Sequence, residues 1–111
     1  MRTTTATIYL YWIIFFVEKE STPRDDELEL LGDDIAEDWM MLGRCLGVSD
    51  SILSEINSAH NQWSGMGYHM LKHWKRKNGS AATYRTLCEA LQHPFVQRKD
   101  LAVKFFNLNG N

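Results

Sequence analysis

The chain of 111 residues is long enough for one domain with a single apolar core. Apolar residues make up 44% of it and charged residues 23%, which excludes a disordered, collagen-like or low-complexity chain. The formal net charge of -2 hides an uneven distribution, because residues 18–55 hold twelve acids and three bases whereas residues 72–104 hold eight bases and two acids. We therefore expect opposite charges at different places on the surface, which favours oriented association with a complementary partner.

The pattern divides the chain into three parts: an apolar extension at 1–20, one domain at 21–108 and a tail at 109–111. The extension contains ten successive apolar residues at 8–17. This run is shorter than the roughly 20 residues of a membrane-spanning helix, and no small-residue cleavage pattern of a signal peptide follows it. Three alternatives stay open for its role: an unstructured or artefactual extension, membrane attachment through residues 8–17, or a segment packed on the domain.

Within the domain, helical spacing and capping residues predict six short helices and no strand. The first helix should span about 23–36 and the last about 98–107. The predicted caps and ends are Thr22 and Pro23 for the first helix, Asp38 and Gly47 for the second, Ser49 for the third, Ser64 and Gly79 for the fourth, and Thr83 and Pro94 for the fifth. Gly65 and Gly67 should weaken the first turn of the fourth helix.

Apolar residues recur along these helices at spacings of three and four, so that each helix presents one face to a common core. The predicted core residues are Leu31, Ile35, Trp39, Leu42, Leu46, Ile52, Ile56, Leu71, Trp74, Leu87, Leu91, Leu101 and Phe105. The fold class is therefore an all-α bundle of six helices joined by short loops.

Two cysteines, Cys45 and Cys88, stand 43 positions apart without a CxxC motif. We expect both to pack as small apolar residues inside helices. This cysteine usage suits a reducing compartment, and we expect a cytoplasmic protein, membrane-associated only if residues 8–17 attach it.

The order of several motifs resembles the death domain over about residues 25–106. These motifs read Asp38, Trp39, Leu42, Leu46 and Gly47; then Ser49, Ile52 and Ile56; then Leu71, Trp74 and Gly79; then Ala82, Thr83, Leu87, Ala90 and Leu91. Among death domains, the chain looks most like those of apoptotic adaptors such as the Fas-associated adaptor. The resemblance implies an antiparallel Greek-key bundle without catalytic activity that binds other death domains, or further copies of itself, in apoptotic or innate-immune signalling complexes.

Charged residues supply the candidate partner-binding surfaces. The basic run around Trp74 is one candidate, since the resemblance implies that this helix and the following loop take part in assembly. The predicted partner-binding residues are Lys72, Lys75, Arg76 and Lys77, their acidic counterparts Asp33, Asp34, Glu37 and Asp38, the isolated Arg44, and the last-helix group Arg98, Lys99 and Asp100. A solvated helix face is an equally simple interpretation of the basic run. Related adaptors place an arginine just before the fourth helix, and this chain has none there, so partner choice does not carry over.

Other kinds of site have weaker support. His69 and His73 stand four residues apart, as metal-binding histidines do, but no glutamate lies between them and no third ligand follows at a recognisable spacing. Cys88 and His93 lack a third group to orient them as a nucleophile and base. Paired short helices with a basic cluster also occur in nucleic-acid-binding domains, but a pI near 6.0 and an acidic first helix would repel phosphates. We therefore expect no enzyme activity, cofactor, metal or nucleic-acid partner; a cytoplasmic signalling part of a membrane-anchored receptor stays open as an alternative.

Overall fold

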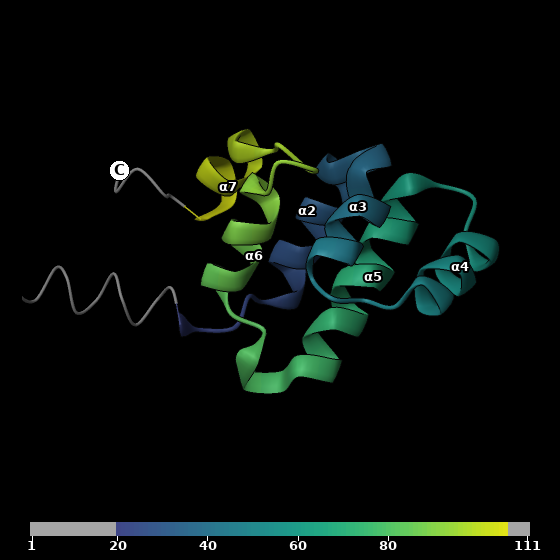
Figure 1. Cartoon of the computed structure of the whole chain (residues 1–111), viewed down its shortest axis with the longest axis horizontal. Helices are drawn as coiled ribbons and strands as arrows, with labels where there is room; N and C mark the ends of the chain where they lie inside the picture. The colour runs from purple at the N-terminus through teal and green to yellow at the C-terminus, as the bar shows by residue number, and fades with distance from the viewer. Residues whose placement is uncertain (1–19, 107–111) are drawn as a thin grey trace, which may run out of the picture.

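The computed structural model describes residues 20–106, which form six α-helices and no strand (Figure 1). The all-α bundle of six helices predicted from the sequence is thereby confirmed. The helices are α2 (Asp25–Ile35), α3 (Trp39–Cys45), α4 (Asp50–Ala59), α5 (Trp63–Asn78), α6 (Tyr84–Gln92) and α7 (Lys99–Phe106), with short 3-10 turns η1 (Ala36–Asp38) and η2 (Gly79–Ala81). The apolar extension, including residues 8–17, and the tail at 109–111 lie outside the described residues.

Four of the predicted caps and ends are confirmed. Ser49 Oγ accepts a hydrogen bond from the Ile52 N–H, and Thr83 Oγ1 accepts one from the Thr86 N–H. Gly47 and Gly79 follow α3 and α5 with φ angles of 85° and 54°, in the left-handed region that glycine tolerates best. These local signals were reliable because each depends on groups only a few residues apart.

Two predicted helix starts, those of α2 and α5, are wrong. The cap of α2 is Arg24 rather than Thr22, because residue 21 is tied to α6 by the Tyr84 N–H donating to the Ser21 carbonyl, and the chain stays extended until residue 24. Pro23 is buried before the helix rather than forming its first turn. Asp38 is the cap residue of α3, as predicted, although its side chain makes no capping hydrogen bond.

The start of α5 differs as well. It lies at Trp63, before the predicted Ser64, with Gln62 as the cap residue. The first two turns of α5 are helical despite Gly65 and Gly67, because the packing of this segment against α2 outweighs the low helix propensity of glycine.

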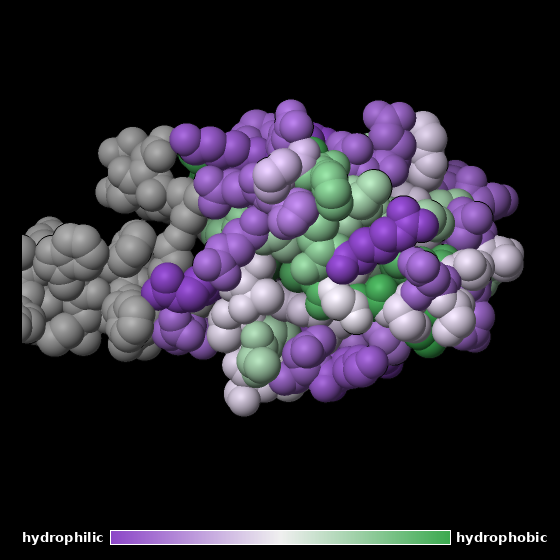
Figure 2. Space-filling view, viewed as in Figure 1, coloured by the Kyte–Doolittle hydropathy of each residue, from purple (hydrophilic) through white to green (hydrophobic). Residues whose placement is uncertain are grey.

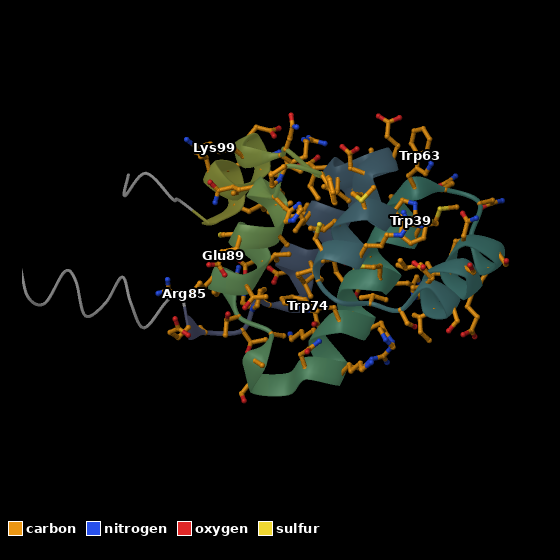
Figure 3. All side chains as sticks on the ribbon, in the orientation of Figure 1. Trp39, Trp63, Trp74, Arg85, Glu89 and Lys99 are labelled. Carbon is orange, nitrogen blue, oxygen red and sulfur yellow. The ribbon has the colours of Figure 1, made fainter. Side chains whose placement is uncertain are left out.

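The core lies between the helices, with Trp74 near its centre (Figure 3). Eleven of the thirteen predicted core residues are at most 9% exposed: Leu31, Ile35, Trp39, Leu42, Leu46, Ile56, Leu71, Trp74, Leu87, Leu91 and Leu101. Ile52 and Phe105 are only partly buried and pack against the edge of the core. On α4 the inward direction is set by Leu53 and Ile56, which turns Ile52 toward the rim. Cys88 is buried as predicted, whereas Cys45 is half-buried.

The closest helix pair is α2 and α5, which run antiparallel. The Asp25 end of α2 lies at Lys75 of α5, and Gly32 near the other end lies at Gly67. A Cβ atom on Gly32 would lie 2.6 Å from the Tyr68 backbone nitrogen, and one on Gly67 would lie 2.8 Å from the Gly32 carbonyl oxygen. The two glycines therefore allow the backbones of these helices to touch, which no other residue would permit.

The remaining helices extend the bundle to both sides of the α2–α5 pair (Figure 1). Helices α6 and α7 pack together on one side, and α4 stands at the opposite end. Figure 2 shows polar side chains covering most of one face, with apolar residues emerging over its middle.

Candidate interaction surfaces

A groove with acidic walls lies between one face of α2 and the N-terminal half of α5. It encloses about 550 Å³ and is lined by Asp26, Glu29, Leu30, Asp33, Ser64, Gly65 and Tyr68, which we call the acidic groove. Leu30 is 58% exposed, so the groove combines apolar surface with carboxylates. Within residues 20–106, Glu29 and Asp33 form no ion pair, whereas Asp26 pairs with Arg24 at 3.0 Å. The groove is thus a negatively charged hollow with two carboxylates available to a ligand.

Basic side chains occupy the other end of the same helix pair. Lys72, Lys75, Arg76 and Lys77, which we call the basic surface, lie on the last two turns of α5, where the helix dipole also favours cations. Lys75 donates from Nζ to Asp25 Oδ1 at 2.9 Å, and this hydrogen bond lowers the pKa of the Asp25 carboxyl. Lys72 lies over the Tyr68 ring, with its Nζ 5.3 Å from the ring centroid. Arg76 and Lys77 are exposed and have no carboxylate partner among the described residues.

Several predicted partner residues are engaged in ion pairs within the chain. Lys104 of α7 donates to Asp34 at 2.7 Å, and Arg98 donates to Asp38 at 3.1 Å, so both acids help to hold α7 against α2 and η1. These pairs join segments that are 60 to 70 residues apart in the sequence. Helical spacing could not reveal them, because it reports only which residues share one helix face.

Two more predicted partner residues, Asp100 and Arg44, have partners within the chain. Arg98 also pairs with Asp100 at 3.0 Å, a contact that raises the pKa of Arg98 and lowers that of Asp100. Arg44 pairs with Asp50 at 3.1 Å and so links the end of α3 to the start of α4. These ion pairs give the residues a structural role, and their role in partner binding stays a prediction.

The predicted acidic surface is therefore divided. Asp33 and Glu37 are exposed and form no ion pair within the described residues, and Asp33 belongs to the acidic groove. Lys99 is exposed at the start of α7, on the side of the molecule away from Trp63 (Figure 3). The structure thus brings Asp33 together with Asp26 and Glu29, two acids that the sequence had not singled out.

An exposed aromatic side chain in the loop between α6 and α7 was also missed. Phe95 is 72% exposed, although its loop is well fixed. The Phe95 N–H donates to His93 Nδ1 at 3.1 Å, the Gln97 side chain donates to the Pro94 carbonyl at 2.8 Å, and Val96 anchors the loop in the core. Gln97 adopts a φ of 54°, a strained value for a residue with a side chain. The sequence signal that could have indicated this exposed side chain is a phenylalanine directly after a proline in a short interhelical loop.

Chemistry of other kinds finds little support in the part of the chain that the structure describes. Among residues 20–106 no three histidine, cysteine, aspartate or glutamate side chains are grouped as a metal site would need, so His69 and His73 have no further ligand there. The described helices include none that is both apolar and long enough to cross a bilayer.

The comparisons with known proteins assign residues 25–107 to one family, since the model of the Death domain matches this range. The match covers the whole helical bundle. No curated protein and no solved structure matches the chain.

Proposed function

The chain belongs to the death domain family of protein-interaction modules in signalling, and from this premise we propose that it assembles with other death domains through the acidic groove and the basic surface. Members of the family bind one another homotypically. The acidic groove of one molecule would receive the basic surface of the next, and the same contact serves whether the neighbour is a second copy or a different death domain.

The observation that carries this proposal is the presence of an acidic and a basic surface on one rigid helix pair. The acidic groove runs along α2 from Asp26 to Asp33 beside the first turns of α5, and the basic surface lies on the last two turns of α5. Both surfaces are therefore fixed relative to each other by the tightest packing in the fold. A fixed separation favours binding in a defined orientation, because little conformational entropy is lost when the surfaces meet.

Single contacts of this kind are weak. An exposed ion pair contributes only about 0.2–1 kcal/mol, and salt screens it. Several pairs repeated over many copies can sum to a stable complex through multivalency. We therefore expect assembly to depend on oligomerisation and on ionic strength, as in a signalling complex that forms only when its members are concentrated.

We also propose a signalling context, a non-enzymatic role and a cellular location for the module. The order of the motifs along the sequence resembles that of apoptotic adaptors, which supports a non-enzymatic role in apoptotic or innate-immune signalling. The sequence has only two cysteines and no CxxC motif, which supports a reducing, cytoplasmic location.

Light scattering on the full chain at low and high salt tests the proposal. We expect assemblies at low salt that dissociate at high salt. The double variant Arg76→Glu with Lys77→Glu should weaken assembly at least about tenfold, because a change of 1.4 kcal/mol in binding free energy is a factor of ten in affinity. Neither side chain has an ion pair among residues 20–106, so the fold should be retained, as circular dichroism would verify.

The matched control is Lys99→Glu, which reverses an exposed base on α7, outside the basic surface. Its assembly should resemble that of the wild type. Equal weakening by Lys99→Glu would point to a surface on α7 instead, and unchanged assembly in the Arg76 and Lys77 variant would contradict the proposal.

A further inference from the structure

Three of the four histidines meet in a groove on the other side of α5. The groove between α4 and α5 encloses about 260 Å³ and is lined by Ile52, Glu55, Ile56, Ala59, His60, His69, His73 and Arg76, which we call the histidine groove. His60 follows the last turn of α4, whereas His69 and His73 lie one turn apart on α5. The histidines therefore bridge two helices rather than belonging to one.

The rings of His60 and His69 are stacked across this interface. Their centroids are 4.2 Å apart and their planes differ by 22°. Gly65 lies beside the stack, and a Cβ atom there would be in ordinary van der Waals contact with His60 Nδ1 at 3.5 Å. The Nε2 atom of His73 is buried in the same region without a hydrogen-bond partner among the described residues.

The charged groups around the stack are mainly basic. Arg76 lines the groove, and Lys72 lies on the same helix within electrostatic reach of His69. Glu55 of α4 is the one acid that lines the groove, and Tyr68 packs its ring edge against His69. Protonation of both stacked rings would therefore place like charges in contact, beside two permanent cations and a single carboxylate.

Helix α4 is the element best able to respond. Only Leu53 and Ile56 of its ten residues are buried, whereas α5 buries five residues of sixteen. In Figure 1, α4 stands at the end of the bundle, where it can separate without unpacking α2, α6 or α7. Segments with few buried apolar contacts are those that open locally while the rest of a protein stays folded.

From this geometry we propose that the α4–α5 contact is sensitive to acid: protonation of the stacked His60 and His69 pair releases α4 from α5 while the α2–α5 pair stays folded. While the rings are neutral, the stack holds the two helices together. Once both rings are protonated, the like charges favour separation of the rings. The helix that bears Leu53 and Ile56 then opens, and its apolar face becomes accessible to solvent.

Proton linkage determines whether acid weakens or strengthens the α4–α5 contact. Burial lowers the pKa of His69 below its ordinary value of 6.5, and His60, Lys72 and Arg76 lower it further. The His69 ring therefore binds a proton more readily when it is separated from the stack than when it is packed. The stability that the stack gives to α4 is complete above pH 6.5 and is lost as the pH falls through the lowered pKa of the packed state.

Amide hydrogen exchange on the full chain, measured by NMR at pH 7.5 and pH 5.0 and corrected for intrinsic rates, tests this proposal. We expect the protection of α4 amides to fall roughly tenfold more than that of α6 amides, because like charges in contact destabilise only the interface that holds them. In His69→Gln this difference between α4 and α6 should be largely lost. His60→Gln should behave alike, and it replaces the first variant if that one does not fold.

The matched control is His93→Gln, which removes the one histidine outside the groove and should keep the wild-type response. Equal loss of protection in α4 and α6 would overturn the proposal. An acid response that persists in both groove variants would overturn it as well.

Discussion

The α2–α5 pair and α4 are attached to the molecule by contrasting means. Gly32 and Gly67 bring the backbones of α2 and α5 into contact, and the pair buries Leu28, Leu31, Met70 and Trp74. Helix α4 buries two side chains and adds a cap, an ion pair and a stack of histidines. Both proposed interaction surfaces lie on the tightly packed pair, and the proposed acid-sensitive contact lies at the lightly packed helix. The rigid α2–α5 pair thus carries the proposed interaction surfaces, whereas the helix proposed to open in acid is α4.

The largest expected effect tests the packing of the α2–α5 pair. Trp74→Ala should lower the free energy of unfolding by about 3–5 kcal/mol, because it removes the largest fully buried side chain. Trp63→Ala, at a site 52% exposed on the same helix, should change it by less than about 0.5 kcal/mol. Urea unfolding measures both values, and a Trp74 variant of near wild-type stability would show that the core assignment is wrong.

A subtler change tests whether backbone contact holds this pair. Gly67→Ala should destabilise by about 1–3 kcal/mol, because its Cβ would lie 2.8 Å from the Gly32 carbonyl oxygen and the helices would have to separate. Gly65→Ala has no contact closer than 3.5 Å and should stabilise by about 0.5–1 kcal/mol through better helix propensity. Opposite signs in urea unfolding are the expected result, and equal effects would argue against close backbone packing.

The smallest expected effect concerns the attachment of α4. Ser49→Ala removes the side chain that accepts from the Ile52 N–H and should cost about 1 kcal/mol. We expect faster hydrogen exchange in α4 with little change in α5. Thr83→Ala, which removes the equivalent cap of α6, serves as the comparison and should leave α4 unaffected. Faster exchange throughout the bundle after Ser49→Ala would mean that α4 unfolds only together with the rest.

Much of the fold was predictable because its determinants are local. Apolar spacing located all six helices, and short-range caps such as Ser49 and Thr83 fixed two of their starts. The start of α2 was missed because a long-range bond, from the Tyr84 N–H to the Ser21 carbonyl, keeps residues 21–24 extended. The sequence predicts only that Gly67 weakens its helix. Its role in close packing could not be predicted, because it depends on Gly32 of another helix, 35 positions earlier in the chain.

The candidate surfaces were predictable only in part for the same reason. The basic run of α5 was visible as a cluster of neighbouring charges. The acidic groove was not, because it combines Glu29 of α2 with Tyr68 of α5 across a helix contact. Asp34 and Asp38 looked available in the sequence, but the fold pairs them with Lys104 and Arg98. Residue type and spacing show which side chains are charged, and only the tertiary structure shows which charges are already paired.

A mixing experiment tests whether the acidic groove of one molecule binds the basic surface of the next. One full-length variant carries Arg76→Glu with Lys77→Glu, and the other carries Glu29→Lys with Asp33→Lys. Each variant alone lacks the complementary charge at one of its two surfaces, so both should be monomeric by light scattering at low salt. A one-to-one mixture restores opposite signs at every contact and should assemble. A mixture that stays monomeric while the wild type assembles would contradict the account, as would either variant assembling alone like the wild type.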